Sequence, residues 1–323
     1  MKYRILGRTG VKVSEIGHGL WGMGGWSDSD DAMSRRALQR SADLGCNFYD
    51  SAWAYGNGKS DGLLGELIRN NPNKRIFAAS KIPPKNLKWP ASSDDPVSAV
   101  YPPDHILDYT EKIRRAMRGR QIDLIQFHVW DDSWSGDEKW QRTIQKMKND
   151  GLIRFFGISL NRWEPENGIK AIETGLVDVV QVIYNIFDQA PEDKLFPLCR
   201  KKNIGVVARV PLDEGSLGGK MTLNTRFPPT DWRARYFGPE NLPQTIEHVE
   251  RLKKVLPKGM SLPTVALRFI LSNPDVSTTI IGMRRPDRVE ENIRASDQGR
   301  LEPSLISTLR EHRWDRAVAP WSD

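Results

Sequence analysis

The stretches Asp123-Leu-Ile-Gln-Phe127 and Val179-Val-Gln-Val-Ile183 decide the fold that we expect for this chain. Each is a short, largely apolar run without the strict alternation of polar and apolar residues that marks a strand with one solvent face. Nearly continuous runs of this kind are typical of parallel strands that are buried on both faces. We therefore expect a parallel sheet whose strands are connected by helices.

Similar runs alternate with amphipathic stretches along the whole chain, which predicts repeated strand–helix units. Eight strands are expected, over residues 16–20, 47–51, 76–81, 122–129, 154–159, 179–184, 205–210 and 278–282. Helices are expected over residues 30–44, 61–69, 103–118, 137–149, 165–173, 192–201, 242–256, 262–271, 286–296 and 303–312. Eight parallel strands, each followed by a helix, close into a (β/α)8 barrel, so the expected fold class is α/β with TIM-barrel architecture. An N-terminal β-hairpin over residues 3–16 precedes the barrel, extra C-terminal helices follow it, and residues 1–323 form one domain.

The composition is that of a soluble protein with ample sequence for a large core. The 323 residues are 38% hydrophobic and 28% charged, with a mean hydropathy of −0.54, which disfavours disorder and a membrane protein. No apolar run approaches the roughly 18 residues of a membrane span, and the start of the chain lacks the apolar stretch of a signal peptide. Cys46 and Cys199 lie far apart in apolar or helical patterns, so we expect reduced thiols, no metal site and a cytoplasmic protein.

The chain is basic. Lys and Arg number 48 against 41 Asp and Glu, which gives a net charge of +7 and a pI near 9.3, so an anionic partner is worth considering. The densest basic stretches, residues 114–120 and 284–288, lack the aromatic interleaving of a single-strand binder and any finger or helix-turn-helix signature. We therefore expect no nucleic-acid partner.

Two short motifs imitate the dinucleotide sites of other folds. Gly17-His-Gly19-Leu-Trp-Gly22 follows a strand, but no helix starts directly after it, and Asp50 comes 28 positions after its last glycine instead of about 20. Tyr55 and Lys59 match the Tyr-x-x-x-Lys pair of short-chain dehydrogenases, but the two glycines between them disfavour the helix that this pair needs. Both motifs are weaker than the evidence for a barrel.

Four polar residues stand at or just beyond the carboxyl ends of three successive expected strands. Asp50 and Tyr55 follow the second strand, Lys81 ends the third, and His128 ends the fourth. In a barrel these ends meet at one mouth, where barrel enzymes carry their sites. A Lys after a strand is usually a surface residue and a lone His is often a structural group. The run Ala78-Ala79-Ser80 before Lys81 nevertheless indicates burial, and Asp50 is the nearest candidate partner by topology.

At these positions the chain resembles the aldo-keto reductase family. Phe48-Tyr-Asp50-Ser-Ala-Trp-Ala-Tyr55-Gly is similar to the family's Asp and Tyr segment, Ala79-Ser-Lys81 to its Lys segment, and Leu124-Ile-Gln-Phe-His128 to its His segment. Four further segments are similar to family motifs. Gly157-Ile-Ser159 is similar to the strand-five motif and Gln181-Val-Ile-Tyr-Asn185 to the strand-six motif. Residues 211–220 are similar to the pyrophosphate loop and residues 281–292 to the adenosine segment. The seven segments occur in order over nearly the full chain.

The resemblance implies hydride transfer from a nicotinamide to an aldehyde or ketone, with proton delivery to the carbonyl oxygen. It makes Tyr55 the general acid, because a Tyr with a reference pKa near 10 carries a proton at neutral pH. The Lys81 ammonium is expected to favour the phenolate and so to lower the pKa of Tyr55. Asp50 would hold Lys81 charged and aimed, and His128 would hydrogen-bond the substrate carbonyl and set its angle to Tyr55.

The resemblance also implies NADPH as the cofactor. Arg284 and Arg288 are placed for an adenosine 2′-phosphate, a group that NADH lacks, although both also fit solvated residues at a helix start. The expected cofactor contacts are Trp21, Asp50, Ser159, Asn161, Gln181, Arg209, Pro211, Leu212, Gly215, Leu217, Gly219, Lys220, Gly282, Arg284, Arg288, Glu291 and Asn292.

Two positions depart from the family pattern. Members often have Asn directly after the strand-five Ser, whereas Leu160 precedes Asn161 here, so the side chain that holds the carboxamide stays open. At the end of strand seven, Arg209 stands where many members place an aromatic residue. We expect Arg209 to stack on the nicotinamide and to disfavour its cationic oxidised form, the alternative being a pair with Asp213 or Glu214.

Three long connections, residues 83–102, 130–136 and 213–241, follow strands and so lie at the expected site face. Seven of the eleven tryptophans fall in segments after strands: Trp21, Trp26, Trp53, Trp89, Trp130, Trp134 and Trp232. We expect Trp21, Trp53 and Trp130 to contact the substrate in an apolar pocket that prefers aromatic or bulky carbonyls.

The expected function is therefore NADPH-dependent reduction of an aldehyde or ketone to the alcohol. The main alternative is an NADPH-binding regulatory subunit without significant turnover, since some relatives of this fold bind NADPH and modulate a membrane channel. A barrel with other chemistry is a third option, disfavoured by the absence of clustered metal ligands in the sequence. The sequence predicts neither the substrate nor the oligomeric state.

Overall fold

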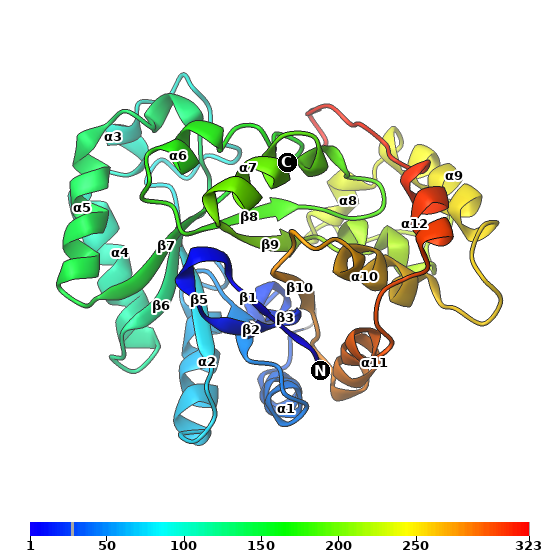
Figure 1. Ribbon diagram of the computed structural model, residues 1–323, viewed down its shortest axis with the longest axis horizontal. Coiled ribbons are helices and arrows are strands. Elements are labelled where there is room, and N and C mark those ends of the chain that lie inside the picture. Colours follow the sequence, from blue (N-terminus) through cyan, green and yellow to red (C-terminus); the bar gives the residue numbers. More distant parts are fainter. Residues whose placement is uncertain (27–28, 323) are drawn as a thin grey trace.

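The computed structural model describes residues 1–26 and 29–322, and it confirms the expected barrel. Eight parallel strands close in the order β10-β3-β4-β5-β6-β7-β8-β9 (Figure 1). They are Ile16–Gly19 (β3), Phe48–Asp50 (β4), Phe77–Ile82 (β5), Ile122–Phe127 (β6), Ile153–Ser159 (β7), Val179–Ile183 (β8), Gly205–Arg209 (β9) and Thr278–Gly282 (β10). Each expected strand is thus present, with ends that differ by at most two residues.

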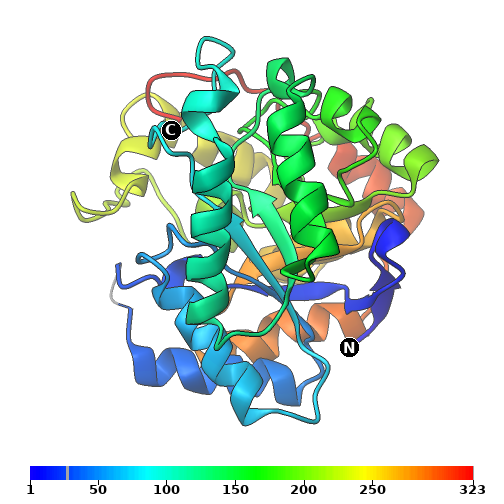
Figure 2. The ribbon, with the colours of Figure 1, turned by 90° about the vertical axis from the view of Figure 1, so that its left-hand side faces the viewer.

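Helices connect the strands and cover the outside of the barrel. They are Asp31–Asp43 (α1), Lys59–Asn70 (α2), Val97–Val100 (α3), Pro103–Ala116 (α4), Glu138–Asn149 (α5), Ile169–Glu173 (α6), Leu195–Lys202 (α7), Arg233–Tyr236 (α8), Asn241–Lys253 (α9), Leu262–Ser272 (α10), Pro286–Asp297 (α11) and Pro303–Arg310 (α12). Figure 2 shows α4 and α5 side by side on the outer surface. In the part of the chain that the structure describes, no helix combines the length and the apolar character needed to cross a membrane.

The expected hairpin closes the N-terminal end of the barrel. Tyr3–Ile5 (β1) and Lys12–Ser14 (β2) pair antiparallel, and the hairpin side chains Leu6, Val11 and Val13 are buried in one cluster with Phe48 and Phe77 of the barrel interior. Gly7 has a φ of +48°, and a Cβ at this position would lie 2.2 Å from the backbone nitrogen of Gly205. Only glycine allows the hairpin to approach the barrel this closely. Because apolar side chains fill this end, a polar site belongs at the opposite end.

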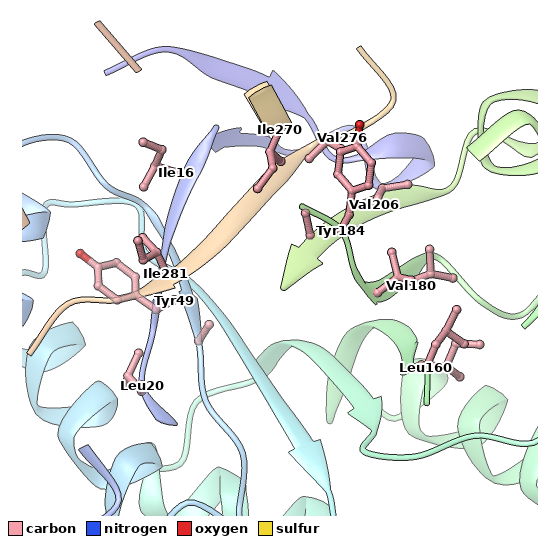
Figure 3. Close-up of a cluster of buried hydrophobic side chains, with 14 of the residues drawn as sticks. Ile16, Leu20, Tyr49, Leu160, Val180, Tyr184, Val206, Ile270, Val276 and Ile281 are labelled. Atoms are coloured by element: carbon pink, nitrogen blue, oxygen red, sulfur yellow. The ribbon is translucent and has the colours of Figure 1, made fainter. Parts of the chain in front are cut away.

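Apolar side chains fill the layer between the barrel and the helices. Figure 3 shows part of this layer, with Ile16, Tyr49 and Ile281 among the labelled residues. His18 belongs to the same layer: its Nδ1 lies 3.0 Å from Ser41 Oγ of α1, and its ring stacks on Tyr49 with 5.9 Å between the centroids. Burial lowers the pKa of His18 to about 4, so the imidazole is neutral at pH 7. The glycine-rich segment around His18 thus contributes a buried structural histidine to the helix–barrel packing.

The C-terminal end of the barrel carries the three long loops. Residues 83–102 contain α3, residues 130–136 contain the 3-10 helix Asp132–Trp134 (η3), and residues 213–241 contain the 3-10 helix Asp213–Gly218 (η5) and α8. The chain after α12, residues 311–322, returns across the same end, drawn in red in Figure 2. It is fixed there by hydrogen bonds such as Trp314 N–H to the Phe187 carbonyl oxygen (2.9 Å).

Candidate active site

Lys81 and Asp50 form a buried ion pair at the carboxyl ends of β5 and β4. The Lys81 Nζ atom lies 2.5 Å from Asp50 Oδ2 and donates a second hydrogen bond of 2.9 Å to the Ser51 carbonyl oxygen. The other Asp50 oxygen accepts hydrogen bonds from the amides of Gln181 (2.8 Å) and Gln126 (3.3 Å). Both charged side chains are at most 2% exposed, and a buried pair is tolerated only when its remaining lone pairs and protons are bonded in this way. Gln126 is not among the site residues predicted from the sequence, although it is the one amide side chain in β6.

The structure brings Tyr55 and His128 to this ion pair. The Tyr55 hydroxyl lies 3.5 Å from Lys81 Nζ, and the Tyr55 ring meets the His128 ring edge-on with 5.7 Å between the centroids. Lys59, in contrast, begins α2 and pairs with Asp31 at 2.8 Å. Tyr55 and Lys59 therefore do not form the pair of a short-chain dehydrogenase, and Lys81 is the cation next to Tyr55.

Burial dominates the ionisation of these groups. It raises the pKa of Tyr55 above 10 and outweighs the opposing charge of Lys81, so the expectation of a lowered tyrosine pKa is wrong. Burial alone would lower the pKa of Lys81, but the Asp50 carboxylate and Tyr55 together raise it above its ordinary value. Burial, assisted by the charges of Lys81 and Arg209, holds the pKa of His128 well below its usual range. At neutral pH the site thus contains a protonated tyrosine, an ammonium ion and a neutral imidazole.

His128 combines a fixed backbone with an unused ring nitrogen. Its backbone N–H donates to the Ile82 carbonyl oxygen (3.1 Å), which holds the residue at the end of β6. Its Nδ1 is buried and has no hydrogen-bond partner within residues 1–26 and 29–322. The Trp89 ring lies edge-on to the imidazole, with 5.8 Å between the centroids, and is 43% exposed. The sequence predicted the long loop that carries Trp89 as part of the site face, but not this residue as a neighbour of His128.

Two further tryptophans surround the mouth. Trp26 lies edge-on to Tyr55 (6.3 Å between centroids), and Trp21 packs on Trp26 at 5.4 Å. Trp21 is 37% exposed, so part of its surface remains accessible to a ligand. Trp53 is partly buried and meets the ring of Tyr109 on α4 edge-on.

Trp130 does not line the mouth, and the expectation of a substrate contact is wrong for this residue. It is 0% exposed and packs between Trp134 and Trp140 at 5.8 and 5.3 Å. Its indole Nε1 donates to Asp132 Oδ1 (2.8 Å). The physical reason is that the loop 130–136 folds back onto α5, so its rings complete the core between β6 and that helix.

The ends of β7 and β8 place Ser159 next to Gln181, because these two residues are register partners. Leu160 turns into the core. Both ends of the Asn161 amide are taken by protein groups: its nitrogen donates to the Ala91 carbonyl oxygen (3.1 Å) and to Glu164, and its oxygen accepts from the Ala91 N–H (3.2 Å). Asn161 thus connects the loop after β5 to the loop after β7. Its side-chain amide is occupied by protein groups and Leu160 has none, so neither side chain offers an amide to a nicotinamide carboxamide at the mouth.

Arg209 ends β9 and has no direct carboxylate partner among the described residues. One of its terminal nitrogens donates to the Leu160 carbonyl oxygen (3.0 Å), and its buried Nε has no hydrogen-bond partner within the same residues. Burial, together with the nearby positive charge of Arg162, lowers the pKa of Arg209 to about 10. The alternative of a pair with Asp213 or Glu214 is wrong, because other arginines occupy both carboxylates.

The segment after β9 has an unusual backbone. Val210, Asp213 and Glu214 have φ values of 56°, 43° and 55°, and Gly215 follows with 109°. Left-handed backbone at a non-glycine residue costs on the order of 1–3 kcal/mol and persists only where the surroundings impose it. Of the expected contacts in this segment, Pro211 and Leu217 are buried, Leu212, Gly215 and Gly219 are partly exposed, and Lys220 is exposed.

The end of β10, next to β9 in the barrel, carries exposed cations. Gly282, Arg284 and Arg288 are exposed, and Arg288 pairs with Glu291 on the first turns of α11, where Asn292 is buried. A Cβ at Gly22 would lie 2.7 Å from the Arg284 side chain, so the segment after β3 packs directly on that arginine.

A cavity of about 840 Å³ lies among the loops at the C-terminal end of the barrel. The loops after β5, β7 and β8 and the C-terminal tail enclose it, and its lining includes Pro90, Asn161, Ile183 and Arg313. Pro90 directly follows Trp89, which contacts His128, but Asp50, Tyr55, Lys81 and His128 are not among the residues that line this cavity.

Known proteins match this chain over nearly its full length. The model of the Aldo/keto reductase family matches residues 15–313. The uncharacterized oxidoreductase YqkF of Bacillus subtilis is 27% identical, with 97% of this chain and 96% of that protein aligned. An NADH-specific methylglyoxal reductase of Escherichia coli is 26% identical (91% and 93% aligned), and a probable voltage-gated potassium channel subunit beta of Arabidopsis thaliana is 28% identical (92% of each aligned).

Solved structures show the same fold. A glycerol dehydrogenase from Gluconobacter oxydans, AKR11B4, has a TM-score of 0.77 at 26% identity, with 96% of this chain and 95% of that chain covered. The holo form of the aldo-keto reductase AKR11C1 from Bacillus halodurans has a TM-score of 0.78 at 21% identity, with both chains fully covered. Because the family model spans most of the sequence, this chain belongs to the aldo/keto reductase family, a family of oxidoreductases.

Proposed function

We propose that this protein reduces an aldehyde or ketone to the alcohol with NADPH. One observation carries the proposal: the Tyr55 hydroxyl lies 3.5 Å from a buried Lys81 ammonium and beside a neutral His128, an arrangement that suits proton donation. The cofactor would supply the hydride when bound.

Tyr55 delivers the proton to the carbonyl oxygen in this proposal. Burial keeps its hydroxyl protonated at neutral pH, and the Lys81 ammonium stabilises the phenolate as the proton leaves. Asp50, held by two glutamine amides, keeps Lys81 charged and directed at Tyr55. His128 is neutral and positions the substrate carbonyl through a ring nitrogen.

The residues around the mouth fit a dinucleotide. Arg209 has a buried Nε without a hydrogen-bond partner among the described residues. Its charge affects the pKa of both Tyr55 and His128, so it lies close to the position that we propose for the nicotinamide. We propose that Arg209 stacks on this ring and that Ser159 and Gln181 contact its carboxamide. The other residues that we propose to contact the cofactor are Trp21, Asp50, Pro211, Leu212, Gly215, Leu217, Gly219, Lys220, Gly282, Glu291 and Asn292.

Arg284 and Arg288 would favour NADPH over NADH, because a guanidinium binds the 2′-phosphate in a bidentate manner. The relative from Escherichia coli is named as NADH-specific, so this preference has to be measured on the chain itself.

Trp21, Trp53 and Trp89 favour an aromatic or bulky carbonyl compound as substrate, whose non-reacting part extends past Trp89 into the cavity of about 840 Å³.

The proposal includes one domain over residues 1–323, a cytoplasmic location, a small molecule as the partner and no nucleic-acid partner.

A second candidate is an NADPH-binding regulatory subunit without significant turnover, which the channel-subunit relatives favour. NADPH oxidation with a panel of aldehydes and ketones, followed at 340 nm, separates the two. We expect turnover that is faster with aromatic or bulky carbonyls than with small polar ones. NADPH binding without oxidation of any substrate in the panel would favour the regulatory subunit.

A further inference from the structure

The C-terminal tail inserts one arginine into the site face of the barrel. The Arg316 side chain is 2% exposed, and its Nη2 donates to Asp188 Oδ2 (2.5 Å) and to Asp213 Oδ1 (2.8 Å). Its Nη1 donates to the Tyr236 hydroxyl (3.1 Å), and its guanidinium lies over the Trp163 ring at 4.9 Å. A single buried guanidinium thus joins the tail to the loops after β7, β8 and β9.

Asp213 is the partner that connects Arg316 to the proposed cofactor loop. It lies in the segment 210–215 and is one of its four residues with positive φ. Its second oxygen accepts a hydrogen bond from Ser216 Oγ (2.6 Å), so the same carboxylate also orders the next turn of the loop. The neighbouring Glu214 pairs with Arg162 at 2.7 Å, which fixes the stretch from its other side.

Long-range ion pairs fix this backbone in addition to its local hydrogen bonds. A left-handed conformation at successive non-glycine residues persists when the surrounding structure imposes it, and here buried ion pairs supply that constraint. One of the two arginines comes from the tail, 103 residues beyond Asp213.

We propose that Arg316 is a positioning residue for cofactor binding: through Asp213 it holds residues 210–220 in the conformation that covers the NADPH pyrophosphate. The inference rests on the proposed function, because it assigns that segment to the cofactor. Arg316 does not contact the cofactor, and the tail governs how long NADPH stays bound.

Asp188 provides a matched control. It accepts a hydrogen bond from the same guanidinium nitrogen as Asp213, but it belongs to the loop after β8 and not to the proposed cofactor loop. Asp188→Asn and Asp213→Asn each remove one charge from the same bridge. If Arg316 has a purely structural role, both changes should alter the NADPH affinity to a similar extent. If it positions the cofactor loop, Asp213→Asn should weaken NADPH binding more than Asp188→Asn does.

The experiment measures NADPH dissociation constants and dissociation rates by fluorescence for the full chain and its variants, with thermal unfolding of each. Arg316→Met and Asp213→Asn should raise the NADPH dissociation constant and the dissociation rate about tenfold or more. Asp188→Asn and Arg310→Met, which changes an exposed arginine outside the cavity, should stay within about threefold of the wild type. Arg316→Lys, which keeps the charge, should recover part of the affinity.

Equal weakening by Asp188→Asn and Asp213→Asn, or unchanged NADPH affinity in Asp213→Asn, would overturn the inference even if Arg316→Met does not fold. A wild-type chain that does not bind NADPH would overturn the proposed function itself, and the inference with it.

Discussion

Replacing Lys81 by Met should remove both stability and catalysis, and the structure allows the two effects to be separated. The methionine leaves the buried Asp50 carboxylate and the Ser51 carbonyl oxygen without the donor that now bonds both. Removing one partner of a buried ion pair costs about 3–5 kcal/mol. The free energy of unfolding of a typical protein is roughly 5–15 kcal/mol, so the variant should unfold at clearly lower urea concentration.

The double variant Asp50→Asn/Lys81→Met removes both charges and should recover about 2 kcal/mol or more of that loss, because an amide is far less costly to bury than an unpaired carboxylate. Neither variant should reduce carbonyls, since Tyr55 has lost the ammonium beside it. Lys59→Met is the control: its pair with Asp31 is partly exposed, so the expected loss is below about 1 kcal/mol. Urea unfolding of all four chains tests the reasoning, which fails if Lys81→Met is as stable as the wild type or if the double variant is no more stable than Lys81→Met.

Three further predictions concern pH and the cofactor. The rate of carbonyl reduction should be independent of pH from about pH 6 to 9. The pKa of Tyr55 is raised above 10, so its proton is lost only at higher pH, and the pKa of His128 lies well below 6.5, so its ring is protonated only at lower pH. A change of rate near pH 7 in the stopped-flow pH–rate profile would contradict this ionisation pattern. Removing Arg284 and Arg288 together should weaken NADPH by about tenfold or more and leave NADH unchanged, and equal dissociation constants of wild type and variant for both cofactors would refute the 2′-phosphate assignment. Arg209→Ala should improve binding of NADP⁺ relative to NADPH, since it removes a positive charge from beside the oxidised ring. An unchanged ratio of the two dissociation constants would refute the claim that the Arg209 charge disfavours the oxidised cofactor.

The barrel could be predicted from the sequence because its information is local. Runs such as Val179–Ile183 are apolar without alternation, and eight of them with helices between them leave one common architecture. The convergence of Asp50, Lys81 and His128 followed from the same pattern, since parallel strands bring their carboxyl ends to one mouth. Their spacing in sequence is large, but the topology fixes their neighbourhood.

The features that the sequence did not predict depend on contacts between distant segments. Trp130 joins the core because α5 offers it a partner in Trp140, and nothing in its own loop distinguishes a core ring from a pocket ring. The Asn161 amide is taken by Ala91, 70 residues earlier in the chain. The pKa of Tyr55 rises because burial outweighs the charge of Lys81, and the balance of these two effects is not readable from residue types. The insertion of the tail between Asp188 and Asp213 had no local signal either.

The most direct test of the proposed chemistry is single-turnover reduction by Tyr55→Phe. The variant keeps the ring and its contacts with Trp26 and His128 but removes the hydroxyl that donates the proton. We predict an NADPH dissociation constant close to that of the wild type and a rate of carbonyl reduction lower by about 10²–10⁴-fold. A Tyr55→Phe chain that binds NADPH and reduces its best substrate at nearly the wild-type rate would contradict the assignment of Tyr55 as the proton donor.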